Sequence, residues 1–258
     1  FVMVATEAAE VGSIVDTTMR GRQLAVLDEG ALVHVVDMPE GERATVELDG
    51  VDTPCAVDIV RGSVFVGDTS GRVHEHLIVS GTCNVLYEPG ISSPVTSLVA
   101  CSEGRHLVIG YADGTATLLD TAAIGRGRVH RIPSDVPVTA VALCSGYTGF
   151  AVCREDASVT LHSFERPDVP VAEFGTTGVV DSAALSADAH LLAVATREPG
   201  LAIYHPDTGG ELLPATPLRE EPLAVAFDRQ DRLYALCEIG GALYRWNLQA
   251  HLLGSDPV

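Results

Sequence analysis

The chain alternates short apolar runs with turns rich in Gly, Asp and Ser, and the stretch from Pro94 to Asp120 shows this pattern most clearly. Three apolar runs, at 95–100, 106–111 and 115–120, are separated by the turns SEGR and Ala112-Asp113-Gly114. Runs bounded in this way predict β-strands, and Asp-Gly suits a tight hairpin because Gly tolerates positive φ. No stretch shows helical periodicity. We therefore expect an all-β fold.

The same pattern recurs about every 42 residues, and a fixed period of this kind indicates a repeat protein. The repeats start near Gly12, Cys55, Val95, Val138, Val180 and Pro222. A small residue in a later turn keeps the same period, at Gly30, Gly71, Gly114, Ala157, Gly200 and Gly241. Each unit contains about four short strands, and four strands in a period of this length predict the blades of a β-propeller. We expect residues 1–258 to form one propeller domain.

Several repeats resemble the WD-repeat (WD40-like) family. The sequence VTSLVACSEGRHLVIGYADGTATLLD follows its order of strand, turn, strand, Asp-Gly turn and strand, and Trp246-Asn247 and Leu119-Asp120 stand at the Trp-Asp position. The repeats are degenerate, because the usual Gly-His pair is missing and Trp is replaced in most units. The resemblance implies a non-catalytic scaffold for protein–protein interactions, as a subunit of a multi-protein assembly.

The number of blades is left open between six and seven. Residues 2–7 align with an outer strand, and residues 250–254 align with another, so one strand is surplus for six closed blades. Either the N-terminal strand completes the last blade, or a seventh blade lies outside this sequence. Because residue 1 is Phe, the chain begins inside a longer product or lacks its true start.

The composition excludes several classes of partner. A formal net charge of −19 disfavours nucleic acid and anionic membrane, which both need a basic surface. No apolar run is long enough to span a bilayer, and the first ten residues lack a secretory n-region. All basic residues are Arg, which fits a GC-rich genome. The six cysteines form no Cys-x-x-Cys motif and predict small, buried, reduced side chains in a cytoplasmic protein.

No residues predict a cofactor, a metal site or a catalytic nucleophile. His76, His162 and His205 are expected to share one repeat position, with packing between blades and a hydrogen bond. His74 and His76 flank Glu75 as two ligands without a third. Asp58 and Asp181 lie on the innermost strands, where we expect them to face the axial channel. The basic cluster Arg126, Arg128, His130 and Arg131 is expected to be a solvated blade rim, with docking of an acidic peptide or phosphate as the alternative.

The acidic side chains concentrate on one rim of the expected propeller. In the WD-repeat strand order, this rim carries the turns from outer to inner strand and from second to third strand. Its turns hold sixteen acidic residues against three arginines, whereas the opposite rim holds eleven acids and ten arginines. The candidate protein-binding residues are Asp28, Glu29, Asp113, Glu155, Asp156, Glu198, Glu220, Glu221 and Glu238. A surface of one sign steers partners of opposite sign, so a basic segment of a protein partner is the expected ligand. The alternative is a propeller enzyme with a substrate or metal site in the axial channel.

Overall fold

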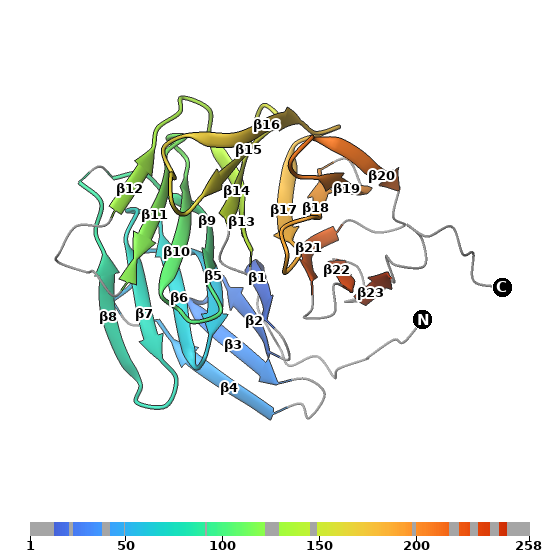
Figure 1. Ribbon diagram of the computed structural model, residues 1–258. Helices are drawn as coiled ribbons and strands as arrows, with labels where there is room; N and C mark the ends of the chain where they lie inside the picture. Colours follow the sequence, from blue (N-terminus) through green and yellow to red (C-terminus); the bar gives the residue numbers. More distant parts are fainter. Residues whose placement is uncertain are drawn as a thin grey trace.

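The fold is all-β, with strands grouped into the blades of a propeller (Figure 1). The computed structural model describes residues 13–20, 23–37, 42–48, 50–90, 92–121, 129–144, 149–197, 200–216, 222–227, 232–237 and 243–246. These residues form six antiparallel sheets, five of four strands and one of three. The predicted fold class is confirmed.

The strands follow one another in chain order within each sheet, so every sheet is an antiparallel meander. The first three sheets contain β1 (Ile14–Arg20), β2 (Gln23–Asp28), β3 (Leu32–Asp37) and β4 (Glu42–Glu47); β5 (Pro54–Val60), β6 (Ser63–Asp68), β7 (Val73–Leu77) and β8 (Thr82–Tyr87); and β9 (Val95–Ala100), β10 (His106–Tyr111), β11 (Ala116–Asp120) and β12 (Val129–Ile132). The last three contain β13 (Val138–Leu143), β14 (Gly149–Arg154), β15 (Ser158–Ser163) and β16 (Pro170–Gly175); β17 (Val180–Leu185), β18 (Leu192–Thr196), β19 (Gly200–His205) and β20 (Gly210–Thr216); and β21 (Pro222–Phe227), β22 (Leu233–Cys237) and β23 (Leu243–Trp246). We number these sheets as blades 1 to 6.

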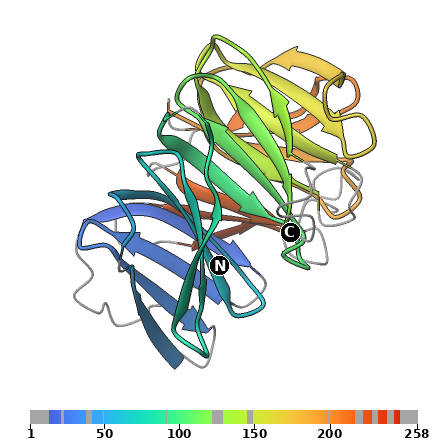
Figure 2. The same ribbon diagram turned by 90° about the vertical axis from the view of Figure 1, so that its left-hand side faces the viewer.

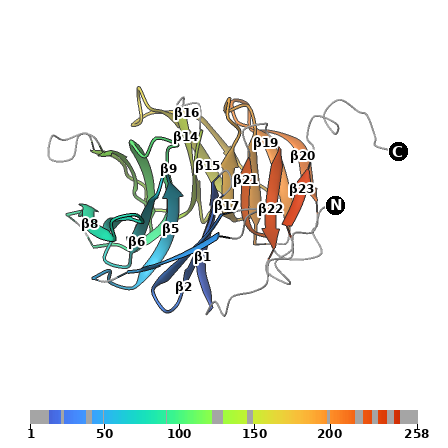
Figure 3. The ribbon, with the colours of Figure 1, turned by 90° about the horizontal axis from the view of Figure 1, so that it is seen from below.

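The first strand of each blade lies innermost. β1, β5, β9, β13, β17 and β21 contact one another in succession, and β21 also approaches β1. Figure 3 shows several of these inner strands gathered toward the middle. Figure 2 shows the same sheets in a view turned by 90° from that of Figure 1. The repeat starts predicted from the sequence therefore correspond to the inner strands.

The core lies between the faces of neighbouring blades. The middle strands are buried on both sides, as in β10, where Leu107 to Tyr111 are all buried, and in β18. The outer strands β8 and β16 are exposed along most of their length. This gradient has a simple cause, because a propeller covers both faces of each sheet with its neighbours but leaves the outer edge to solvent.

The small residue in the turn between second and third strands marks a left-handed backbone. Gly71 and Gly114 have φ values of 90°, and Ala157 has a φ of 64°. In blade 1 the left-handed residue is Ala31, with a φ of 58°, one position after the Gly30 assigned from the sequence. A shared turn geometry thus explains the periodic small residue.

Two predictions from the sequence concern the ends of the chain. The expected outer strand from Val2 to Glu7 and the segment 250–254 lie outside the described residues. Trp246 is on the third strand of blade 6, as predicted, and its side chain also lies outside the described part.

Candidate functional site

The turns between second and third strands are held against the starts of the inner strands, so both kinds of turn share one rim. In blades 1, 3 and 4 the first residue after the second strand donates its N–H to a backbone carbonyl. The carbonyl belongs to the residue directly before the inner strand. These bonds are Glu29 to Ser13 at 3.0 Å, Ala112 to Pro94 at 3.0 Å and Glu155 to Pro137 at 3.0 Å. Blades 2 and 5 use Thr69 to Thr53 and Arg197 to Val179. The repeated bond supports the rim geometry expected from the sequence.

Four of the expected acids are exposed on this rim. Glu29, Asp113, Glu155 and Asp156 all lie in turns between second and third strands and are exposed. Asp113 accepts a hydrogen bond from the Thr115 N–H at 2.9 Å, and Asp156 accepts one from the Ser158 N–H at 3.0 Å. Hydrogen bonds from Ser158 lower the pKa of Asp156, so this carboxylate is charged at neutral pH. We call Glu29, Asp113, Glu155 and Asp156 the acidic rim. Glu198, Glu220, Glu221 and Glu238 lie outside the described residues.

Two arginines near these turns have polar partners of their own. Arg154 is 6% exposed, and its guanidinium donates to the Thr160 hydroxyl at 2.9 Å inside the blade. Arg197 is exposed but pairs with Asp181 at 3.0 Å. Asp181, which lies on the inner strand β17, thus has Arg197 as a partner for its carboxylate.

Asp28 was expected on the exposed rim, and the structure corrects this. Asp28 is 4% exposed; its Oδ1 accepts the Leu32 N–H at 3.0 Å, and its Oδ2 lies 2.9 Å from His34 Nε2. Burial would raise the pKa of Asp28, but the hydrogen bonds from His34 and Leu32 outweigh it and lower the pKa. The side chain turns back into its own hairpin, so this acid is not available to a partner.

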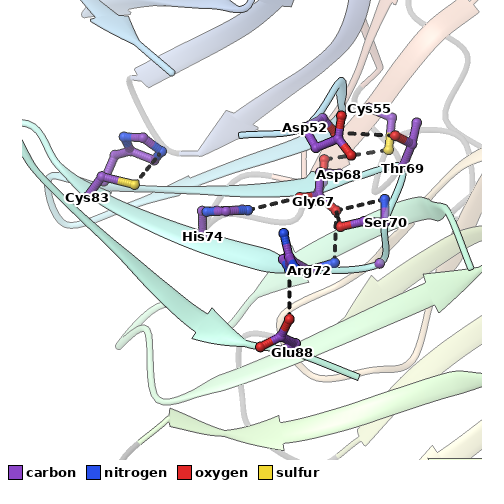
Figure 4. A network of polar contacts seen from close by, with 12 residues as sticks. Asp52, Cys55, Gly67, Asp68, Thr69, Ser70, Arg72, His74, Cys83 and Glu88 are labelled. Atoms are coloured by element: carbon purple, nitrogen blue, oxygen red, sulfur yellow. Dashed lines mark hydrogen bonds and ion pairs between the residues drawn. The ribbon is translucent and has the colours of Figure 1, made fainter. Parts of the chain in front are cut away.

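Asp68 holds the equivalent position in blade 2 and is fully buried (Figure 4). It accepts hydrogen bonds from the Ser70 N–H, the Ser70 hydroxyl and the Arg72 N–H, at 2.7 to 2.9 Å, and its Oδ2 lies 3.0 Å from His74 Nε2. Figure 4 shows these donors converging on one carboxylate. Arg154 and Thr160 occupy the same two positions in blade 4, also six residues apart. A hydrogen bond between two polar side chains, one on the second strand and one on the third, thus recurs in three of these blades. The sequence could have indicated it through the repeated six-residue spacing.

A shallow depression opens beside the acidic rim in blade 4. It is lined by Asp156, Ser158, Glu173, Phe174 and Thr176, among others, from the β14–β15 turn and from β16. Two carboxylates beside a half-buried aromatic ring offer both a charge and an apolar contact to a basic side chain. Glu173 and Phe174 could not be identified from the sequence. They come close to the β14–β15 turn only because β16 pairs with β15.

The inner strands carry two carboxylates that bind neighbouring blades. Asp58 is fully buried, which corrects the expectation that it faces the channel. Its Oδ1 accepts from the Thr18 hydroxyl in blade 1 at 2.8 Å, and its Oδ2 accepts from the Ala100 N–H in blade 3. Asp16 in blade 1 accepts the Val57 N–H of blade 2 at 2.8 Å. Both carboxylates are therefore engaged in joining blades.

The histidines mostly have partners within their blades. His76 lies 3.2 Å from Cys83 Sγ, and His162 bonds the Pro167 carbonyl at 2.8 Å and stacks on Phe150. His74 is bound to Asp68, so the two-ligand arrangement of His74 and His76 is already occupied by protein partners.

His205 does not share the position of His76 and His162. Those two residues pair with Val64 and Phe150, each four residues before the end of the second strand of its blade. In blade 5 the residue four before the end of the second strand is Leu192, and its partner is Tyr204. A shift of one residue turns a side chain to the other face of a strand. The expectation that His205 shares one repeat position with His76 and His162 is therefore wrong, because Gly200 lies one position later than the small turn residue of the other blades.

The described cysteines Cys55, Cys83, Cys101, Cys144 and Cys153 are all free. Burial raises the pKa of Cys153 to about 12. Cys83 is exposed, which corrects the expectation that every cysteine is a buried small residue.

The expected basic cluster is only partly described. His130 lies 3.7 Å from Asp168, and Arg131 donates to the Tyr87 hydroxyl at 3.3 Å. Arg126 and Arg128 lie outside the described residues. No helix in the described part of the chain is long and apolar enough to cross a membrane.

The comparisons with known proteins agree with the propeller. No family model matches the sequence, and no curated protein matches it. Among solved structures, the chain is similar to Raptor from Chaetomium thermophilum, with a TM-score of 0.70 and 15% identity. The match covers 86% of this chain and 22% of that one, so this chain spans less than a quarter of Raptor's length. In all, 1805 chains of solved structures match. The fold is a β-propeller, and so common a fold does not fix a function.

Proposed function

We propose that the chain is a non-catalytic scaffold that binds a basic segment of a protein partner through the acidic rim, as part of a multi-protein assembly. The observation that carries this proposal is the placement of Glu29, Asp113, Glu155 and Asp156 in equivalent exposed turns of one rim. The nearby Arg154 is buried and bonded to Thr160, and Arg197 is paired with Asp181, so the guanidinium groups of both arginines already have partners of their own. A fixed array of like charges on a rigid rim steers a basic partner and sets its orientation.

The depression in blade 4 supports a specific anchor point. A Lys or Arg side chain placed there would meet Asp156 and Glu173, while its methylenes pack against Phe174. An extended basic peptide held at this point would then lie along the neighbouring turns of the acidic rim. We also propose that the protein works in a reducing compartment inside the cell, which the free cysteines support.

The enzyme alternative receives less support from the geometry. Asp16 and Asp58 lie on inner strands, and both accept backbone N–H groups from neighbouring blades. Carboxylates with these structural bonds serve to join blades. The rim is the surface on which charged groups stay available to a partner.

The test is a matched pair of charge reversals. One variant is Glu155→Arg with Asp156→Arg on the acidic rim, and the other is Glu103→Arg with Glu165→Arg in exposed turns of the opposite rim. Both change the net charge equally. A fluorescent Lys/Arg-rich peptide serves as the probe, with binding followed by anisotropy at about 50 mM and about 300 mM salt.

We expect the rim variant to bind the peptide at least about tenfold more weakly than wild type, and the control variant to bind nearly as wild type does. Higher salt should weaken binding to wild type, because exposed charges are screened over about 10 Å at 0.1 M ionic strength. Equal losses in both variants would mean that overall charge, rather than the acidic rim, attracts the peptide. Unchanged binding in the rim variant would also overturn the proposal.

A further inference from the structure

Two histidines and an aspartate meet on the rim of blade 5 that lies opposite the acidic rim. His190 lies in the turn between β17 and β18, His205 is the last residue of β19, and Asp207 lies in the turn between β19 and β20. One ligand atom from each residue, two imidazole nitrogens and a carboxylate oxygen, lies within 4.8 Å of the others. The two imidazole rings have centroids 6.4 Å apart. Two segments well separated in sequence thus bring three metal-ligating groups together.

Both turns are held in place by their own hydrogen bonds. In the first, Asp188 Oδ1 accepts from the Ser186 hydroxyl at 2.7 Å and from the His190 N–H at 3.0 Å, which fixes the backbone that carries His190. In the second, the Gly209 N–H donates to the His205 carbonyl at 2.9 Å. The histidines are therefore presented by ordered backbone, whereas His190 and Asp207 keep exposed side chains that can adjust.

His205 has an unmet hydrogen-bonding group at this place. Its Nδ1 atom is buried and has no hydrogen-bond partner among the described residues. By contrast, His76 and His162 have Cys83 and Pro167 as partners of a ring nitrogen. A buried imidazole nitrogen without a partner is costly, and a cation bound at His205 Nδ1 would satisfy it. This observation is independent of the clustering of the three ligands.

We propose that His190, His205 and Asp207 bind one divalent transition-metal ion. Two imidazoles and one carboxylate are ligands suited to Zn²⁺, Cu²⁺, Ni²⁺ or Fe²⁺, whereas Mg²⁺ and Ca²⁺ prefer oxygen ligands alone. Zinc bonds to nitrogen and oxygen are about 2.0–2.2 Å long, so the ligand atoms must draw closer than 4.8 Å when the ion binds. Rotation of the exposed His190 and Asp207 side chains supplies this adjustment.

The ion would connect two turns of one blade. It would link the β17–β18 turn to the β19–β20 turn and leave its remaining coordination positions to water or to a ligand from another molecule. The negative charge of the whole chain, −19, favours the approach of a cation.

Zinc chloride titrated into the full chain, followed by calorimetry under a thiol-free reductant, tests the site. The variants His190→Ala and Asp207→Asn each remove one exposed ligand without opening the core. His130→Ala is the matched control, because it removes another surface histidine beside an aspartate, Asp168, where no third ligand is described. Each variant is also prepared with Cys83→Ser, which removes the exposed thiol as a competing zinc ligand.

We expect one zinc ion per chain, at least about tenfold weaker binding in each ligand variant, and unchanged binding in the control. Zinc should also raise the melting temperature of wild type and of the control, but not of a variant that lacks both exposed ligands. Cobalt substitution gives a second measurement, since its visible absorption should appear in wild type and be lost with either ligand. Absence of saturable one-to-one binding, or equal binding in wild type and ligand variants, would overturn the proposal.

Discussion

At the residue scale, a small polar side chain on the inner strand joins blades 1, 3 and 5 to the blade that follows each of them. The same position of blades 1, 3 and 5 holds an acceptor for a backbone N–H of the following blade: Asp16 for Val57, Ser97 for Val141 and Ser182 for Val225, at 2.8 to 3.1 Å. In blades 2, 4 and 6 this position is Ala. Blade 1 is thus unusual in using a charged group for a task that serine performs elsewhere.

This difference predicts a pH-dependent effect of replacing Asp16. Burial raises the pKa of Asp16 to about 7, against the hydrogen bonds from Val57 and Thr17, and the nearby charge of Asp58 adds to the rise. The native state then binds more protons than the unfolded state between the ordinary pKa of 3.8 and about 7, so this residue's contribution to stability falls as pH rises through that window. We expect Asp16→Ser to keep the bond to Val57 and to gain stability relative to wild type as pH rises from 5 to 8. Urea unfolding at both pH values measures this.

The control for Asp16→Ser is Asp181→Ser, which replaces an exposed aspartate on another inner strand. We expect no comparable gain there. If Asp16→Ser has the same effect at pH 5 and pH 8, the carboxylate does not titrate in this window.

At the element scale, adjacent blades approach most closely where the second strand of one blade meets the inner strand of the next. Gly67 in β6 and Gly110 in β10 hold equivalent positions, and a Cβ atom at either would overlap the first valine of the following inner strand, Val95 or Val138. In blade 4 the same position holds Cys153, which is fully buried. The residue at this position therefore differs between blades, and it determines how closely each blade can approach the next.

The close approach predicts that Gly110→Ala destabilises the protein. Val138 is 1% exposed and belongs to the core between blades 3 and 4, so it has little room to move. Overpacking of this kind typically costs about 1–3 kcal/mol. Gly90→Ala is the matched control, since Gly90 is exposed and an added Cβ would meet nothing within 4 Å. Thermal unfolding should show a lower melting temperature for Gly110→Ala alone. Equal melting temperatures for both variants would show that the blades can separate at little cost.

At the scale of the whole molecule, the five cysteines whose side chains the structure describes differ in exposure. Cys101, Cys144 and Cys153 are buried, whereas Cys83 lies on the outer strand of blade 2 and is exposed. Burial also raises the pKa of Cys55 to about 12, with the charges of Asp68 and Asp16 adding to the rise. The thiols of Cys55 and Cys153 are therefore protonated at neutral pH.

Alkylation should follow this difference in exposure. We expect iodoacetamide to label Cys83 first in the native protein and all six cysteines after denaturation, as measured by intact mass. Labelling of Cys101, Cys144 or Cys153 as fast as Cys83 would show that the blades open readily. A pair of sites missing after denaturation without reductant would reveal a disulfide.

The sequence by itself determined the repeat, and with it the blades. Strand and turn patterns are local, so the inner-strand starts at Val95, Val138, Val180 and Pro222 could be predicted to the residue. The exposed turn acids Glu29, Asp113, Glu155 and Asp156 were also placed correctly, because hairpin turns project to the rim.

Only the tertiary structure decided what each polar side chain contacts. Asp28 turns inward to His34, and Asp58 is enclosed by three blades, because partners 6 and 40 or more residues away determine their burial. His205 was assigned to the wrong face by one residue, and strand register alone corrects such an error. Its approach to His190 depends on two turns that meet only when blade 5 folds, since contacts between side chains far apart in sequence are fixed by the pairing and packing of strands.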